Sequence, residues 1–264
     1  MIGFGGEVLG DANEILLCEI EGAIAHITLN RPDKRNALND ELIAALKQAL
    51  RTATDHDQVC VIMLKGAGAD FCSGADLSSL QKIAKASVIE NLEDAENLMG
   101  LFALIRDGVR VPVVAVVQGR ALAGGCGLAT ACDIVLAAQS ARFGYPEVRI
   151  GFVPAMVMAI LRRNVSEKRA FELITRGAEI SAEEAAHIGL INHVYDDDSF
   201  ETEVDVYVKG FEKISRSAVM LAKRLLYHMD GMTFETALRS GVDLNALARM
   251  TEDCQKGVAR FLKK

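Results

Sequence analysis

Residues 59–77, VCVIMLKGAGADFCSGADL, join an apolar run to a glycine-rich turn and then to a helical pattern. The apolar run at 59–64 has the length and composition of a buried strand. Residues 113–127, VVAVVQGRALAGGCG, repeat this order, with a buried strand at 113–117 and a second glycine turn at 119–127. Both turns lead from a strand into a helix, where free backbone N–H groups point outward.

The segments around these two turns continue the alternation of strands and helices. Asn39 is expected to cap one helix, and a long helical stretch with some interruption is predicted from the first turn to about Asp107. This order favours an α/β fold with parallel strands and crossover helices, and alternation alone fits a doubly wound sheet equally well. Further strands are predicted at 14–20, 23–29 and 133–138, with a short helix at 128–132.

The last third of the chain is mostly helical in pattern. Ser181 and Glu184 form the capping-box pattern of one helix. A last short strand is predicted at 191–195, after which helical periodicity dominates. We therefore predict a core over residues 1–199 and a separate helical region over residues 200–264.

The composition restricts the class of protein. The formal net charge of -7 argues against a nucleic-acid partner, although an anionic coenzyme needs only a few local Lys or Arg residues. The cysteines and histidines lack metal-ligand spacing, so we expect no metal, and the cysteines are interpreted as buried free thiols. The start of the chain lacks a signal-peptide pattern, and the apolar run at 111–117 is too short to span a bilayer. A cytoplasmic protein without a membrane partner is expected.

The two glycine turns fit few known kinds of site. Phe71 stands where a dinucleotide fingerprint beginning at Gly66 would need a glycine. Neither turn is followed by the Gly-Lys-Ser/Thr of a phosphate-binding loop. The remaining interpretation is an oxyanion hole, in which two N–H donors converge on one oxygen. Either glycine cluster considered alone would be interpreted as a tight turn.

Several motifs in order resemble the signatures of the enoyl-CoA hydratase/isomerase (crotonase) superfamily. The resemblance begins near Leu16 and extends to the C terminus. Its motifs are Asn30-Arg31-Pro32 with Asn36-Ala37-Leu38-Asn39, Phe71-Cys72-Ser73-Gly74-Ala75-Asp76-Leu77, Ala123-Gly124-Gly125-Cys126 with Ala131-Cys132-Asp133-Ile134, Arg142-Phe143-Gly144-Tyr145-Pro146-Glu147 with Ile150-Gly151-Phe152-Val153-Pro154, and Ile180-Ser181-Ala182-Glu183-Glu184-Ala185.

The resemblance implies a crotonase-like spiral of ββα repeats with a C-terminal helical trimerisation region, assembled as a homotrimer or a dimer of trimers. It places Ala75 and Gly124 at the positions of the family's oxyanion-hole donors. Glu147 falls on one of the two catalytic glutamates of hydratases. The other glutamate position is occupied by Gly127, which is a departure from the hydratase pattern.

The substrate implied by the resemblance is an acyl-CoA thioester, with coenzyme A as part of the substrate and no separate cofactor. Lys34 and Arg35 match the family's nucleotide-binding segment, and Phe261 and Lys264 match C-terminal positions that reach a neighbouring subunit's ligand. Asp76 and Asp133 are interpreted as hydrogen-bonding residues of a helix or turn rather than as bases. The remaining candidate substrate-binding residues are Ala37, Ser73, Gly74, Asp76, Leu77, Gly125, Gly127 and Tyr145.

The single matched glutamate favours one reaction over another. Glu147 alone can remove a proton from C2 of a 3-enoyl thioester and return it to C4, while hydration needs a second group to hold water, and losing one acid/base group commonly costs about 10²–10⁴-fold. We therefore predict double-bond isomerisation, with hydration by Glu147 and an ordered water, such as one held by Tyr145, as the alternative. A non-catalytic acyl-CoA-binding or RNA-binding relative is a further alternative.

Overall fold

The computed structural model describes residues 7–8, 15–76, 81–82 and 85–263. Its main sheet has seven strands in the order β1-β2-β3-β4-β5-β7-β10. The first three strands are antiparallel, and β3 to β10 pair in parallel, as the alternation of elements predicts. These strands are β1 (Glu7–Val8), β2 (Leu16–Glu21), β3 (Ile24–Leu29), β4 (Val61–Gly66), β5 (Val113–Val117), β7 (Ile134–Ala138) and β10 (His193–Tyr195).

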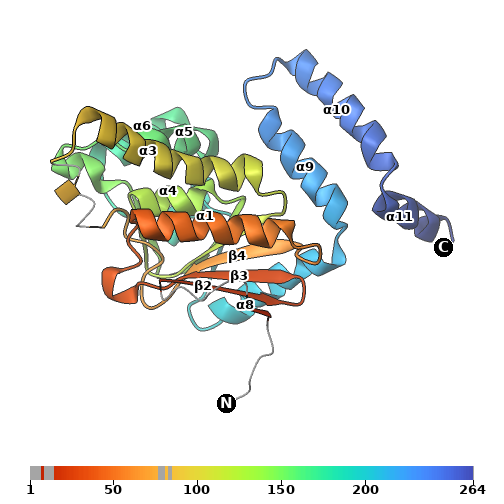
Figure 1. The fold of residues 1–264 in the computed structure, drawn as a ribbon, viewed down its shortest axis with the longest axis horizontal. Coiled ribbons are helices and arrows are strands. Elements are labelled where there is room, and N and C mark those ends of the chain that lie inside the picture. Colours follow the sequence, from red (N-terminus) through yellow and green to blue (C-terminus); the bar gives the residue numbers. More distant parts are fainter. Residues whose placement is uncertain (1–6, 9–14, 77–80, 83–84, 264) are drawn as a thin grey trace.

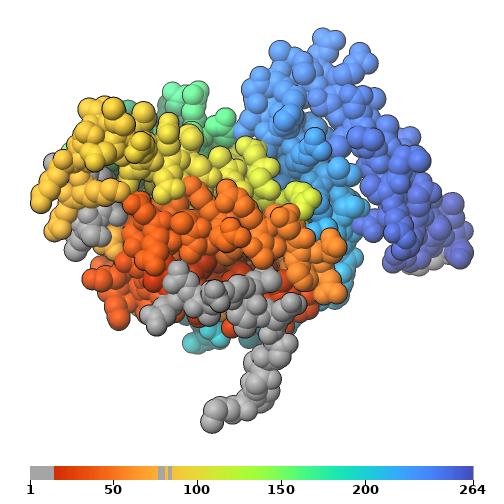
Figure 2. Space-filling view, in the orientation of Figure 1, coloured from red at the N-terminus to blue at the C-terminus, as the bar shows by residue number. Residues whose placement is uncertain are grey.

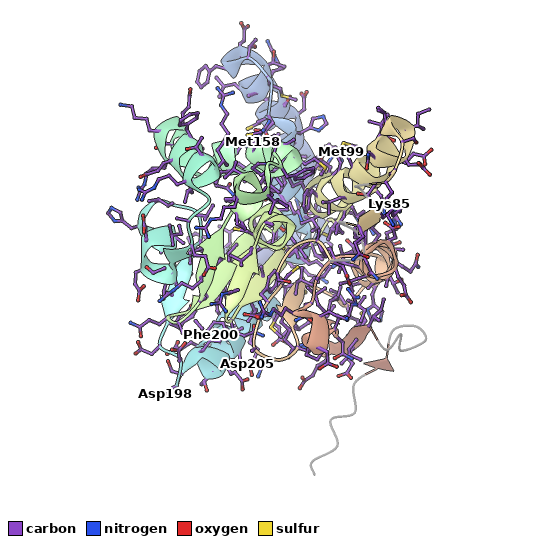
Figure 3. All side chains as sticks on the ribbon, turned by 90° about the vertical axis from the view of Figure 1, so that its left-hand side faces the viewer. Lys85, Met99, Met158, Asp198, Phe200 and Asp205 are labelled. Atoms are coloured by element: carbon purple, nitrogen blue, oxygen red, sulfur yellow. The ribbon has the colours of Figure 1, made fainter. Side chains whose placement is uncertain are left out.

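Helices cover both faces of this sheet. On one face lie α1 (Asp40–Asp55) and α3 (Val88–Ala103), the latter continued by a π-helical turn, η2 (Leu104–Gly108). On the other face lies α8 (Phe200–Lys209). Its buried Phe200 packs with the strand residues whose side chains point to this face of the sheet. Figure 3 shows Phe200 and Asp205 of α8 on one side of the sheet, with Met99 and Met158 on the other. The boundary predicted near residue 200 therefore places α8 in the helical region, although this helix lies against the sheet.

The predicted cap and apolar stripe of α1 are confirmed. The Asn39 side chain accepts a hydrogen bond of 2.9 Å from the Leu42 N–H, which satisfies one free donor of the first turn. The stripe lies against the sheet and is buried throughout: Leu42, Ile43, Leu46, Ala49, Leu50 and Ala53.

A second, smaller sheet connects the two glycine turns to the rest of the molecule. It contains three strands in the order β6-β8-β9. Helices between and after these strands contribute residues to the lining of the candidate site, and one short 3-10 helix precedes the strands in the chain. These elements are η1 (Pro32–Lys34), β6 (Arg120–Leu122), α4 (Gly124–Ala131), β8 (Arg142–Gly144), η3 (Pro146–Ile150), α5 (Ala155–Asn164), α6 (Glu167–Arg176), β9 (Ile180–Ser181) and α7 (Ala182–His187).

Two details of the predicted elements are corrected. The helix predicted at 128–132 begins at Gly124, because the glycine turn itself forms the first helical turn. At the start of α7, Ser181 accepts from the Glu184 N–H at 3.1 Å, but the Glu184 carboxylate accepts from Arg169 instead of closing a capping box.

The chain ends in three helices, of which the first packs against the body of the protein and the last two project from it. They are α9 (Arg216–His228), α10 (Phe234–Arg249) and α11 (Glu252–Leu262), and they follow the short η4 (Gly210–Lys213). In Figures 1 and 2, α10 and α11 stand to one side of the remaining elements. Neither of these two helices contains a buried residue. Every helix in the described part of the chain is too short or too polar to cross a bilayer.

Candidate active site

The two glycine turns meet in the folded chain. Cys72 donates its N–H to the Arg120 carbonyl at 3.1 Å, and the Leu122 N–H donates to the Cys72 carbonyl at 3.0 Å. Gly74 has a φ of +92°, and a Cβ at this position would lie 2.8 Å from the Ala123 Cβ and 3.4 Å from the Gly124 nitrogen. Gly74 is therefore needed both for its backbone conformation and for the close approach of the second turn.

The N–H groups of Ala75 and Gly124 have no acceptor among the described residues. Leu38 donates its N–H to the Gly74 carbonyl at 2.7 Å and accepts from the Asp76 N–H at 3.0 Å. Ala75 lies between these two partners, so its N–H points away from Leu38. Gly124 is the first residue of α4, and a first-turn N–H has no intrahelical acceptor. Both amides are available to a ligand oxygen.

The second turn includes a strained backbone position. Ala123 has a φ of +51°, which is unusual for a residue with a side chain, and its N–H donates to the Gly144 carbonyl at 2.8 Å. Such positions cost about 1–3 kcal/mol and are found preferentially at functional sites. The strained conformation of Ala123 sets the direction of the Gly124 amide that follows it. The sequence alone did not predict this strained conformation.

A buried network supports the first turn from behind. The Arg31 guanidinium donates to the Asp76 carboxylate at 2.6 Å and to the Ala37 carbonyl. The Asn36 side chain donates to the carbonyls of Ala67 at 2.9 Å and Asp70 at 2.8 Å. Asp76 therefore helps to hold the turn, which agrees with its interpretation as a hydrogen-bonding residue. Ala37 contributes its carbonyl to the same support.

A cavity of about 380 Å³ opens in front of the two free amides. Ser73, Ala75 and Gly124 line it on one side, and Glu147 lines it from η3. Most of the remaining wall is hydrocarbon, contributed by Leu38, Ile43, Leu98, Ile150, Phe152, Val153, Met156 and Val157. The two turns and Glu147 are thus brought together, although they are distant in sequence.

Glu147 is held in the cavity without a partner for one carboxylate oxygen. Its Oε2 is buried and has no hydrogen-bond partner among the described residues. Burial raises the pKa of the Glu147 carboxyl above its usual range, and a hydrogen bond from its own backbone N–H opposes this only in part. The η3 turn is fixed because the Glu147 carbonyl accepts from the Phe152 N–H at 3.0 Å. A carboxylate in this environment can accept a proton from a bound molecule.

The other carboxylates that line the cavity are paired. Lys82 donates to the Asp40 carboxylate at 2.8 Å, and its Nζ lies 3.9 Å from the Asp94 carboxylate. Among the described residues, no group of three His, Cys, Asp or Glu side chains is arranged to hold a metal ion.

The remaining sequence-predicted site residues lie in several places. Tyr145 is fully buried, with its hydroxyl 3.4 Å from that of Thr130, and it does not line the cavity. The Tyr145 hydroxyl therefore faces Thr130 in the core. The Arg35 carbonyl accepts from the Ser73 N–H at 3.0 Å, which places the exposed Lys34 and Arg35 side chains beside the first turn.

Two of the glycines predicted to bind substrate have packing roles. A Cβ at Gly125 would collide with the Cys72 carbonyl, and one at Gly127 would collide with Val157. Phe261 is exposed on α11, away from the cavity lining. Leu77 and Lys264 lie outside the described residues.

The model of the enoyl-CoA hydratase/isomerase family matches residues 19–264. The chain belongs to this family. It is 37% identical over 244 residues to a Thermus thermophilus protein named "Putative enoyl-CoA hydratase", with 92% of this chain and 96% of the relative covered. It is 32% identical to the 2,3-dehydroadipyl-CoA hydratase of Escherichia coli, with 90% and 91% covered.

Solved structures agree with this family assignment. An enoyl-CoA hydratase from Mycobacterium smegmatis superposes with a TM-score of 0.90 at 30% identity, covering 95% of this chain and 97% of that one. Human enoyl-CoA hydratase domain-containing protein 3 superposes with a TM-score of 0.89 at 28% identity, covering 94% and 97%. The crotonase-like fold predicted from the sequence is confirmed, and the chain is an enzyme of the enoyl-CoA hydratase/isomerase family that acts on acyl-CoA substrates.

Proposed function

We propose that this family member moves the double bond of an enoyl-CoA from the 3 to the 2 position. Glu147 removes a proton from C2, the resulting dienolate oxygen is held by the Ala75 and Gly124 amides, and the same carboxyl delivers a proton to C4. No other atom enters or leaves. The observation that carries the proposal is the partnerless Glu147 oxygen in the cavity that the two free amides face.

The two backbone amides contribute because their hydrogen bonds strengthen as negative charge develops on the thioester oxygen. They are held by the fold and need no rearrangement, and removing one donor of this kind costs about 10²–10³-fold in rate. The raised pKa of Glu147 makes its carboxylate a better proton acceptor. Both features serve proton transfer next to a thioester, and neither requires a cofactor. Coenzyme A enters only as part of the substrate.

Hydration of a 2-enoyl-CoA is the second candidate. The names of the Thermus thermophilus and Escherichia coli relatives favour it. It requires a water held against C3, and Gly127 offers no side chain for this purpose. A non-catalytic acyl-CoA-binding or RNA-binding role is the third possibility, and binding of 2- and 3-enoyl-CoA without turnover of either would support it.

We also propose a homotrimer or a dimer of trimers. The supporting observation is that α10 and α11 bury no side chain, although they carry large apolar residues. Lys34 and Arg35, beside the first turn, are proposed to meet the anionic coenzyme. A cytoplasmic location stays a prediction.

The decisive experiment supplies the enzyme with matched 2-enoyl-CoA and 3-enoyl-CoA substrates in D₂O. Isomerisation predicts conversion of the 3-enoyl to the 2-enoyl compound. Because the carboxyl exchanges its proton with the solvent between the two transfers, deuterium is expected at C4 and, through the reverse step, at C2. We expect Glu147→Gln to lower this exchange by about 10²–10⁴-fold while coenzyme A binding persists. Glu201→Gln, which makes the same change on the exposed surface of α8, is the control. Undiminished exchange in Glu147→Gln would remove this residue from the mechanism.

A further inference from the structure

A side chain at position 127 would compete with the Val157 side chain for the same space between α4 and α5. Gly127 lies one turn after Gly124 on α4 and is buried. A Cβ at position 127 would collide with Val157 Cγ1 and would lie 3.2 Å from Phe102 Cζ. Val157 therefore fills the volume into which a side chain at 127 would extend.

Val157 is also part of the cavity wall. It is only 4% exposed, and it lines the same cavity as Ala75, Gly124 and Glu147. Leu98 and Met156 also contribute hydrocarbon to the wall of this cavity. A water molecule needs two to four polar partners to be held in such a place.

The geometry of α4 places this hydrocarbon surface near the reacting carbons. Three helical residues rise about 4.5 Å, which is the step from Gly124 to Gly127. With the thioester oxygen held at the Gly124 amide, C2, C3 and C4 lie within a few bonds of that oxygen. The side chains that surround position 127 therefore stand beside the segment where proton transfer or water addition takes place.

We propose that Val157 is a specificity-determining residue that keeps water away from C3 and thereby favours isomerisation over hydration. Hydration breaks one O–H bond of water, forms a C3–O bond and places a proton on C2. Isomerisation only moves a proton from C2 to C4. Excluding water at the Val157 surface blocks the first reaction and leaves the second intact. This inference rests on the isomerase function proposed above.

The test measures the ratio of hydrated to isomerised product, by NMR, from a common enoyl-CoA substrate. Val157→Thr keeps the side-chain shape and adds a hydroxyl that can hold water at the wall. We expect the ratio to rise by about tenfold, which corresponds to roughly 1.4 kcal/mol in the relative barrier heights. Val165→Thr, the same change just beyond the end of α5 and outside the cavity lining, is expected to leave the ratio unchanged.

A second pair of variants keeps the inference testable if Val157→Thr does not fold. Gly127→Glu alone is expected to gain no hydration, because Val157 occupies the space of the new side chain. Gly127→Glu with Val157→Ala is expected to gain hydration, because the methyl groups in the way are removed. Equal hydration by the single and the double variant would overturn the role of Val157, as would an unchanged ratio in a folded Val157→Thr.

The outcome is separable from that of the proposed function. The isomerase assignment is decided by the unmodified enzyme and Glu147→Gln, through conversion and deuterium exchange. The role of Val157 is decided by the product ratio in variants that keep Glu147. An enzyme that already hydrates efficiently with Val157 in place would contradict both.

Discussion

Glu147 combines a chemical role with an energetic cost to the fold. Burial raises the pKa of its carboxyl in the folded protein, so the unfolded chain ionises first as the pH rises. Well below the pKa of this carboxyl in the unfolded chain, it is protonated in both the folded and the unfolded state, and its burial costs no folding stability through ionisation. The cost develops as the pH rises through the unfolded and then the folded pKa, and it is complete above both.

Glu147→Gln is therefore expected to stabilise the protein at neutral pH. The amide has no charge to desolvate, so the melting temperature of the variant should exceed that of the parent at pH 7, and the gain should shrink toward pH 4. Thermal melts across this pH range measure it. Glu201→Gln, on the exposed surface, should show no such pH-dependent gain. A variant less stable than its parent at pH 7 would mean that the carboxylate has a stabilising partner.

Gly127 is expected to resist substitution despite lying in a helix. Gly→Ala in a helix interior normally stabilises by about 0.5–1 kcal/mol. Here the new methyl group meets Val157, so Gly127→Ala is predicted to destabilise by about 1–3 kcal/mol. Val157→Ala should relieve part of this loss, giving a favourable coupling in a double-mutant cycle measured by urea unfolding. Additive effects would show that the two positions do not compete for space.

The residues of the site were predictable to different degrees. The glycine turns and Glu147 carry local motifs, so their positions followed from the sequence. Val157 lies on a different helix from Gly127, and its periodicity indicates only a core-facing residue. The strained φ of Ala123 arises from the contact of two distant turns and leaves no local signal. Tyr145 was expected to bind substrate, but its hydroxyl faces Thr130 in the core.

The elements were predicted well where hydrophobic periodicity decides them. The strands at 113–117 and 23–29 agree with β5 and β3 within one residue. The start of α4 was predicted late, because glycines disfavour helices and tertiary contacts override that preference here. The long helical stretch predicted after the first turn contains α3, whose Ser87 capping box fixes its start.

One buried lysine joins α9 to the body of the protein. Lys223 Nζ donates to the carbonyls of Ile105 at 2.9 Å and Val111 at 3.0 Å, and to the Asp133 carboxylate at 2.7 Å. Asp133 also accepts from the Tyr227 hydroxyl at 2.6 Å, so it is a structural residue, as interpreted from the sequence. Desolvation lowers the pKa of Lys223, while Asp133 opposes this shift.

Lys223→Met is predicted to destabilise the protein by about 3–5 kcal/mol, because it leaves a buried carboxylate without its cation and two carbonyls without a donor. Chemical denaturation measures the loss. Lys168→Met, on the exposed surface of α6, should change stability by less than about 0.5 kcal/mol. Similar stability of the two variants would show that the Lys223 contacts do not secure α9.

At the scale of the whole molecule, α10 and α11 expose a large apolar surface. Large apolar side chains on these helices are strongly exposed, among them Phe234 at 81%, Phe261 at 79% and Leu262 at 78%. Exposed patches of this kind mark interaction surfaces, and the homotrimer or dimer of trimers proposed above would cover them with further copies of the chain. In Figure 2 the two helices stand to one side of the body, and α9 packs against both of them.

Sedimentation velocity is expected to give a species of three or six chains. Leu238 and Val242 lie one turn apart on α10 and are both exposed in the single chain, so a carboxylate at each should be tolerated by the fold but not by a buried interface. We predict that Leu238→Asp with Val242→Asp shifts the protein toward monomers, whereas Thr202→Asp on α8 does not. If burial in the assembly is what fixes these helices, the monomeric variant should also lose protection from hydrogen exchange throughout α10 and α11. A variant that remains trimeric would place the contacts between subunits elsewhere on the molecule.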